Sequence, residues 1–344
     1  MAVITVGTDG DQTTLNAAIA AATSGDEIRV IAGFSHDGTT VNVSKSNLTF
    51  TKADGVTAAV FSSNDKTVEC GPTLTGISFT GYQFTNTHAG SGYRYVLYLN
   101  VSQVTINECA LNMQTGNNKV TPLVTLPGGG SQFFRCAFFG NSSQQYGLVH
   151  NVSGTVIVDS CLILNVGKYG LWSSGTGPLI VRNCTVYTPT QASVTSAGIW
   201  VNTVGSGVYN TIVFGSSDMN WGVRAKSDPS VQISNVISYG TMPTAFYASG
   251  ATVANVYDQS DVTADGNPVL VDPAGGDFHP DTSGIAFEGG NASFTSAKDY
   301  DGNDWGSPPS IGALEAESSG GGGGGGAVSP SKAGFLSSPF TLNP

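Results

Sequence analysis

The chain has 344 residues and a formal net charge of −11, and only 11% of its residues are charged. An average domain has about 25% charged residues. Binding to nucleic acid or to an anionic membrane depends on clustered Lys and Arg, which this chain lacks, so we expect neither partner. No apolar run approaches the roughly 20 residues that a membrane-spanning helix needs.

The N-terminal residues Met1–Gly7 do not resemble a secretion signal, because they contain no basic residue and only a short apolar run. The polar residues of the chain are nevertheless mostly Ser, Thr and Asn, as in proteins that work outside cells. We therefore expect synthesis in a host cytoplasm and assembly into a virion released by lysis. Leaderless export and a trimmed N-terminus are the alternatives.

A repeat dominates residues 39–260, where seven segments combine alternating apolar residues with a polar residue, often Asn, and then a small or thiol residue. The small or thiol position falls at residues 109, 136, 161, 184, 211, 236 and 256, with spacings of 27, 25, 23, 27, 25 and 20. Units this short must stack on their neighbours to bury an apolar face. The pattern predicts an all-β, right-handed parallel β-helix over residues 39–260, and the spacing is too short for a four-stranded propeller blade of about 40 residues.

A second repeat has a glycine followed by an aliphatic residue and runs in phase with the first. It occurs at Gly147-Leu148, Gly170-Leu171, Gly198-Ile199 and Gly222-Val223, 10 to 14 residues before the segment that carries the small or thiol residue. We expect these glycines at bends, because glycine tolerates positive φ. Aromatic residues recur beside them, and we expect these either to pack between coils or to bind sugars: Tyr146, Tyr169, Trp172, Trp200 and Trp221.

Four of the five cysteines, Cys109, Cys136, Cys161 and Cys184, occupy one position of the repeat. Stacked parallel side chains lack the geometry of a disulfide, so we expect a structural ladder of buried thiols. A metal site is the alternative, but no CxxC or paired His accompanies these cysteines.

The C-terminal part of the sequence consists of three segments that differ in composition. Residues 261–316 are rich in Asp, Gly and Pro, and we expect an irregular cap that closes the end of the solenoid. Residues 317–326 form a Gly-rich linker. Residues 327–344 are predicted to be an extended docking arm, which would bind a partner through Phe335, Leu336, Pro339, Phe340 and Leu342.

These repeats, together with residues 13–22 (TTLNAAIAAA) and 25–30 (GDEIRV), resemble the pectate-lyase-like β-helix superfamily over residues 1–316. The resemblance implies that residues 1–38 form a short amphipathic cap helix and the first strand. It also implies that residues 299–303 and 311–315 belong to a closing segment. The fold hosts lyases, hydrolases, adhesins and phage spikes, so the resemblance implies no single function.

Charged residues near the thiol position suggest two interpretations. Glu108, Arg135, Asp159 and Arg182 alternate in sign along successive repeats. We expect salt bridges between coils, and the alternative is a catalytic stripe with Glu108 and Asp159 as acid and base and Arg182 as charge stabiliser. Residues 299–304 (DYDGND) partly resemble a calcium loop, but the glycine is misplaced, so we expect an Asx-type turn and no cofactor, with a Ca²⁺ site as the alternative.

We expect a non-catalytic structural protein of a bacteriophage virion, a decoration or auxiliary protein of the capsid, anchored through its C-terminal arm. Its partners would be a capsid or other virion protein and, as an open alternative, a cell-surface glycan. A polysaccharide lyase or glycoside hydrolase acting as a depolymerase is the second hypothesis, and a glycan-binding adhesin is the third. The oligomeric state stays open, with a homotrimer as one candidate.

Overall fold

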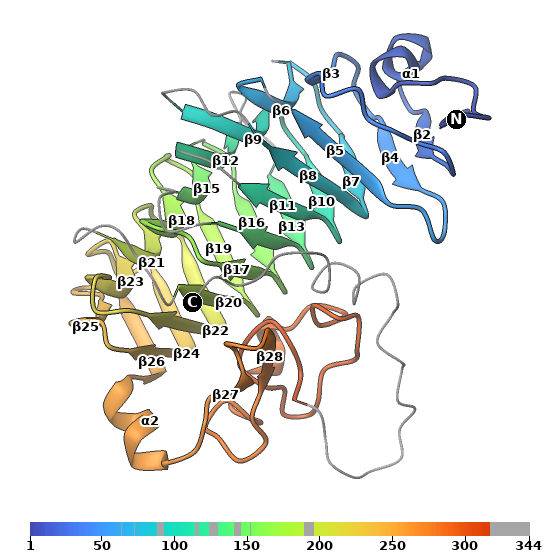
Figure 1. Ribbon diagram of the computed structural model, residues 1–344. Helices are drawn as coiled ribbons and strands as arrows, with labels where there is room; N and C mark the ends of the chain where they lie inside the picture. Colours follow the sequence, from blue (N-terminus) through green and yellow to red (C-terminus); the bar gives the residue numbers. More distant parts are fainter. Residues whose placement is uncertain are drawn as a thin grey trace.

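The computed structural model describes residues 1–62, 64–71, 73–87, 93–113, 117–123, 130–140, 146–151, 153–188 and 196–316. These residues build a solenoid of short parallel strands, whose coils stack along one axis (Figure 1). The strands form a 17-stranded sheet, which comprises two rows, and a nine-stranded sheet.

The first row of the 17-stranded sheet begins each coil. It consists of β1 (Val3–Val6), β2 (Glu27–Val30), β4 (Thr49–Lys52), β7 (Ser78–Thr80), β10 (Thr105–Asn107), β13 (Ser131–Phe134), β16 (Val156–Asp159), β19 (Leu179–Arg182) and the first halves of β22 (Gly207–Gly215), β24 (Gln232–Gly240) and β26 (Thr252–Tyr257). The second row consists of β5 (Ala58–Ser62), β8 (Tyr82–Asn86), β11 (Ala110–Met113), β14 (Ala137–Phe139), β17 (Leu162–Leu164), β20 (Thr185–Thr188) and the second halves of the same three long strands.

The nine-stranded sheet forms the remaining face of the solenoid. Its strands are β3 (Val41–Val43), β6 (Lys66–Cys70), β9 (Tyr93–Asn100), β12 (Asn117–Leu123), β15 (Tyr146–His150), β18 (Tyr169–Ser173), β21 (Ala197–Val201), β23 (Trp221–Ala225) and β25 (Thr244–Tyr247). Consecutive strands pair in parallel, one coil apart, so equivalent residues of neighbouring coils stand side by side.

A left-handed residue makes the sharp turn between the first and second rows. Its φ lies between 43° and 56° in seven successive coils, at Glu108, Arg135, Ser160, Asn183, Asn210, Asn235 and Asn255. Asn adopts this conformation more readily than most residues because its short polar side chain can hydrogen-bond locally. The recurring Asn of the sequence repeat is therefore explained by backbone geometry.

The residue after each left-handed turn points into the core. The thiols of Cys109, Cys136, Cys161 and Cys184 are free and buried at successive coils, and the fifth free cysteine, Cys70, is buried as well. Burial raises the pKa of the Cys161 thiol. These thiols fill the core together with aliphatic and aromatic side chains, such as the stacked rings of Phe50 and Phe79.

A helix covers the N-terminal end of the solenoid. Helix α1 (Leu15–Ala21) begins at Thr14, whose hydroxyl accepts a hydrogen bond from the backbone N–H of Ala17, and it buries Leu15, Ala18 and Ile19. It lies next to β1, β2 and β3 (Figure 1). A cap helix in this position is what the family resemblance implies. In the described part of the chain, no helix is long and apolar enough to cross a membrane.

The C-terminal segment corrects one expectation. It contains α2 (Gln259–Asp265), β27 (Leu270–Asp272), β28 (Asp277–Pro280) and the 3-10 helix η1 (Ala292–Phe294). Residues 269–314 lie along the side of the solenoid, against the outer face of the second row, and do not close its end (Figure 1). We call residues 269–314 the strap.

Packing explains where the strap lies. Second-row strands carry buried apolar residues on both faces, as in Leu162–Leu164, so their outer face also needs cover. The strap supplies it with Leu270, Phe278, Tyr300 and Ile311, among other residues.

Candidate functional site

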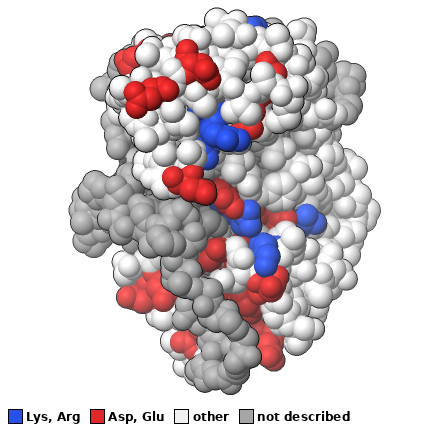
Figure 2. All heavy atoms as spheres, turned by 90° about the vertical axis from the view of Figure 1, so that its right-hand side faces the viewer, with Lys and Arg blue, Asp and Glu red and all other residues white. Residues whose placement is uncertain are grey.

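The charged residues highlighted by the sequence form ion pairs between coils. The Arg135 guanidinium contacts the Glu108 carboxylate, and both residues occupy left-handed turns. Arg182 Nε lies 2.9 Å from Asp159 Oδ2, and both residues end first-row strands. Each carboxylate is therefore held by its own arginine, which is the arrangement of salt bridges between coils. Figure 2 shows that Lys and Arg side chains lie among Asp and Glu side chains on the face to the right of Figure 1.

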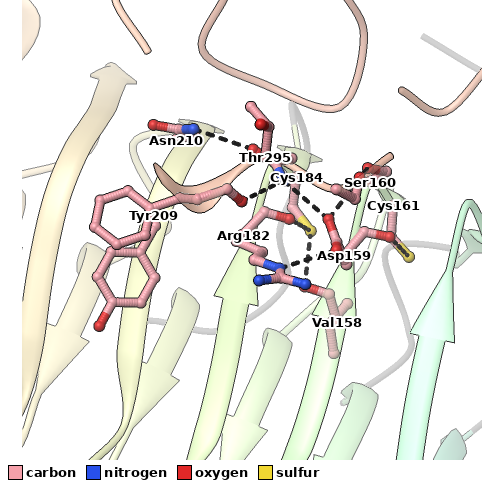
Figure 3. Close-up of polar contacts among 12 residues, drawn as sticks. Val158, Asp159, Ser160, Cys161, Arg182, Cys184, Tyr209, Asn210 and Thr295 are labelled. Atoms are coloured by element: carbon pink, nitrogen blue, oxygen red, sulfur yellow. Dashed lines mark hydrogen bonds and ion pairs between the residues drawn. The ribbon is translucent and has the colours of Figure 1, made fainter. Parts of the chain in front are cut away.

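Asp159 is enclosed as well as paired (Figure 3). Its carboxylate is fully buried, and it accepts hydrogen bonds from Asn183 Nδ2 at 2.9 Å and from Ser160 Oγ at 3.2 Å. Ser160 Oγ also lies 2.9 Å from Ser296 Oγ of the strap region. A general acid or base must reach the substrate, and a carboxylate with this many partners under a covering segment is better suited to holding the coils together.

A row of asparagines binds the strap to the solenoid. Asn183, Asn210 and Asn235 each donate from Nδ2 to a strap carbonyl, those of Phe294, Asn291 and Gly289 respectively, at 2.9 Å. Asn210 Oδ1 also accepts a hydrogen bond from the backbone N–H of Asn291 at 2.8 Å. The same residues thus make the left-handed turn and fix the strap.

The segment with a partial likeness to a calcium loop is a hydrogen-bonded turn. Asp299 Oδ1 accepts from the backbone N–H of Asn303 at 2.6 Å, and Oδ2 accepts from that of Glu315 at 3.1 Å. Burial raises the pKa of the Asp299 carboxyl. Among the described residues, no three His, Cys, Asp or Glu side chains are grouped so that they could hold a metal.

The feature best suited to a ligand lies on the nine-stranded sheet. Six aromatic residues of β15, β18, β21, β23 and β25 form what we call the aromatic strip: Tyr146, Tyr169, Trp172, Trp200, Trp221 and Tyr247. The five strands that carry these residues are consecutive in one sheet and stack along the solenoid axis (Figure 1). The sequence singled out the first five of these residues.

Ring contacts join β15, β18 and β21, and a separate contact joins β23 and β25. The Tyr146 and Trp172 rings stack at 5.1 Å between centroids, and Tyr169 lies 5.3 Å from Trp200. Tyr146 and Tyr169 are buried, while Trp172, Trp200 and Trp221 are half-buried. The Tyr247 side chain is 50% exposed. The indole rings therefore both pack between coils and present aromatic surface to solvent.

Two cations lie on the aromatic strip. The Arg224 guanidinium is 4.1 Å from the centroid of the Trp200 ring and 4.4 Å from that of Trp221. Lys168 Nζ lies 5.4 Å from the centroid of the Tyr169 ring. Within the described strands of the nine-stranded sheet, Glu69 is the only carboxylate, and it pairs with Lys66 at 2.6 Å. The strip is therefore a cationic aromatic surface.

The glycines beside the strip have a different role from the expected one. Gly147, Gly170 and Gly198 lie inside strands and do not have positive φ. A Cβ on Gly147 would lie 2.3 Å from the carbonyl oxygen of Gly170, and one on Gly170 would lie 2.5 Å from that of Gly198. Glycine is needed here because the backbones of successive coils approach too closely for a side chain.

The sequence matches no known family model and no curated protein. Among solved structures, the chain is similar to the pectate lyase Pel9A, with a TM-score of 0.51, 14% sequence identity, and coverage of 92% of this chain and 97% of that chain. The chain is a right-handed parallel β-helix. The fold predicted from the sequence is thus confirmed.

Pectin methylesterases are also similar to this β-helix. The enzyme from Aspergillus niger has a TM-score of 0.48 and 16% identity, over 74% of this chain and 85% of that chain. The enzyme from carrot has a TM-score of 0.45 and 15% identity, over 72% of this chain and 83% of that chain.

The residues predicted to dock on a partner lie outside the described part of the chain. They are Phe335, Leu336, Pro339, Phe340 and Leu342.

Proposed function

We propose that this β-helix binds an elongated carbohydrate along the aromatic strip and does not cleave it. The observation that carries the proposal is the run of ring contacts across β15, β18 and β21, which Arg224 extends to Trp221 of β23 and, through the contact of Trp221 with Tyr247, to β25. At a strand spacing of about 4.8 Å, four steps between five strands span roughly 19 Å. A surface of this length suits a short oligosaccharide lying parallel to the solenoid axis.

Aromatic rings suit this ligand class for a physical reason. A sugar ring presents C–H groups on a face, and these pack against the electron-rich face of an indole or phenol ring. Half-buried rings such as Trp172, Trp200 and Trp221 are held in place by their neighbours, so little side-chain entropy is lost on binding. The fold shared with Pel9A adds no argument for the ligand, which is inferred from the strip alone.

The charge of the strip favours an acidic saccharide. Arg224 has no ion-pair partner among the described residues, so its guanidinium N–H groups are available to a ligand carboxylate or sulfate. The aromatic faces of Trp200 and Trp221 hold this guanidinium in place. Lys168 supplies a second positive charge at the Tyr169 ring.

The distribution of carboxylates supports binding without hydrolysis. Glycosidases of the common mechanism need two carboxyl groups beside the scissile bond. The described strands of the nine-stranded sheet contain only Glu69, which is held by Lys66. The segments between residues 113 and 196 that lie outside the described part contain no Asp or Glu in their sequence. Glu108 and Asp159, the alternative catalytic pair, are engaged by Arg135 and Arg182 on the first-row side.

The test combines binding with product analysis. A panel of neutral and acidic oligosaccharides is titrated into the protein, and the fluorescence of the indole rings is followed. Trp200→Ala is expected to weaken binding by about tenfold, as loss of one aromatic stacking contact does. Arg224→Gln should weaken binding of acidic glycans only. Phe61→Ala, which removes a 45% exposed ring on the second row, is the matched control and should leave binding unchanged.

Two results would overturn the proposal. If no glycan of the panel binds, or if Trp200→Ala binds as well as the parent chain, the strip is only a packing feature. If mass spectrometry detects shortened or unsaturated products after long incubation, the β-helix is an enzyme. The virion location, the anchoring arm and the homotrimer stay predictions from the sequence, and the comparison of full-length chain with residues 1–316 in a pull-down tests the anchor.

A further inference from the structure

The two ends of the solenoid differ in whether another element of the chain covers the last coil. At the N-terminal end, α1 buries Leu15, Ala18 and Ile19 against the first coil. At the C-terminal end, β25 pairs only with β23, and the first half of β26 pairs only with β24. Within the described ranges, no element pairs with the outer edge of these strands, and α2 contributes no buried residue. We call β25 together with Thr252–Asn255 the open end.

Core positions become exposed at the open end. Ile233 of β24 is fully buried, and its partner one coil later, Val253, is 41% exposed. Val223 of β23 is also fully buried, while its partner Phe246 is only half-buried. The unpaired edge of a parallel sheet with exposed apolar residues attracts another strand, and terminal repeats of solenoids need a cap.

We propose that residues 327–344 of the same chain cover the open end, through the proline-free residues 331–338. These eight residues (SKAGFLSS) contain no proline and lie between Pro330 and Pro339, so their backbone can pair along its whole length. Adjacent residues of an extended segment point to opposite sides, so one of Phe335 and Leu336 faces Val253.

The length of the chain allows this contact. The strap meets the second row at Thr185, whose Oγ1 accepts from the backbone N–H of Ala313 at 3.0 Å. From Thr185, the register runs through Ile212 and Ile237 to Tyr257, which is three coils or roughly 14 Å at 4.8 Å per coil. A flexible Gly-rich linker of ten residues, such as 317–326, spans about 16–19 Å.

Charge favours this occupant over a second copy of the chain. Residues 258–265, which follow β26 directly, contain Asp258, Asp261 and Asp265 and no basic residue. Two open ends brought together would therefore repel each other. Residues 327–344 contain Lys332 and no Asp or Glu side chain, so they complement the acidic end. Stacking of one open end on the N-terminal end of another copy is blocked by α1.

Hydrogen exchange of backbone amides tests the proposal. Full-length chain is compared with residues 1–316, which keep the whole strap. Truncation is expected to speed exchange in peptides covering residues 244–257 by about tenfold or more and to leave peptides covering 289–301 unchanged. The difference should be independent of protein concentration, because the contact is intramolecular. Lys332→Glu should speed exchange of the same peptides at low salt, and Lys332→Arg should not.

Three outcomes would overturn the proposal. Equal exchange at residues 244–257 in both chains means that residues 327–344 do not cover the open end. Protection that grows with protein concentration, together with dimers in sedimentation, means that a second copy does. A full-length chain whose open end exchanges fast, but which loses binding to a purified partner protein on truncation, means that residues 327–344 serve as an arm for that partner.

Discussion

Replacing Asn183 with alanine tests whether the asparagine row holds the strap in place. Asn183 is fully buried and has a φ of 50°. Its side chain donates to Asp159 and to the Phe294 carbonyl, and it accepts from Asn210 Nδ2 at 3.1 Å. Asn255 occupies the same turn with the same φ of 50°, but it is exposed and its side chain makes no hydrogen bond to any described residue.

The expected losses follow from these contacts. Alanine in a left-handed turn costs about 1 kcal/mol. Each neutral hydrogen bond contributes about 1 kcal/mol, and one to a carboxylate contributes about 2 kcal/mol. We therefore expect Asn183→Ala to lower the free energy of unfolding by about 5 kcal/mol and Asn255→Ala by about 1 kcal/mol.

Urea unfolding measures both variants. Indole fluorescence reports the nine-stranded sheet, and far-ultraviolet circular dichroism reports all strands, so agreement of the two midpoints checks that unfolding is cooperative. The reasoning is refuted if Asn183→Ala loses no more stability than Asn255→Ala. In that case the hydrogen bonds to the strap would contribute no net stability.

Three further predictions concern other parts of the solenoid. His150 is fully buried, with Nδ1 3.0 Å from Ser173 Oγ, and burial lowers its pKa from 6.5. As the pH falls, the unfolded chain therefore takes up a proton at this histidine before the folded chain does. Stability should be full above pH 6.5 and decline below it, and His150→Gln should flatten this decline in urea midpoints measured from pH 8 to 5. Gly170→Ala should lower the free energy of unfolding by about 1–3 kcal/mol, because the new Cβ would lie 2.5 Å from the Gly198 carbonyl oxygen. An unchanged melting temperature would contradict this close contact. All five cysteines are free and buried, so a thiol reagent should react with none of them in the native protein and with all five in urea; rapid reaction of a native thiol would show that the ladder opens.

The sequence predicted the coils because each coil repeats the same local requirement. A left-handed turn that favours Asn and a buried small residue recur at Asn183-Cys184 and Asn210-Thr211. Period and register therefore follow from the pattern alone. The reason for the glycines was wrong, because the close approach of Gly147 to Gly170 depends on how two coils stack and is invisible within one coil.

The strap could not be placed from the sequence. Its contacts join residues far apart in the chain, such as Asn210 with Asn291 and Ser160 with Ser296, and no repeat connects them. A signal existed in the consecutive apolar residues Leu162–Leu164, which indicate a strand covered on both faces. Their partner, however, is set by three-dimensional packing. The sequence identified five residues of the aromatic strip. The contacts between their rings and the position of Arg224 became evident only in the folded chain.

The lateral position of the strap sets an order of events during synthesis. Coils that stack only on their neighbours can form as the chain leaves the ribosome, N-terminal coils first. The outer face of the second row, with Leu162, Tyr187 and Ile212, stays uncovered until residues 269–314 have been made. If a ribosome stalls before residue 269, the released chain therefore has a complete solenoid with an exposed apolar surface along the second row. Such a chain is a substrate for chaperones and proteases.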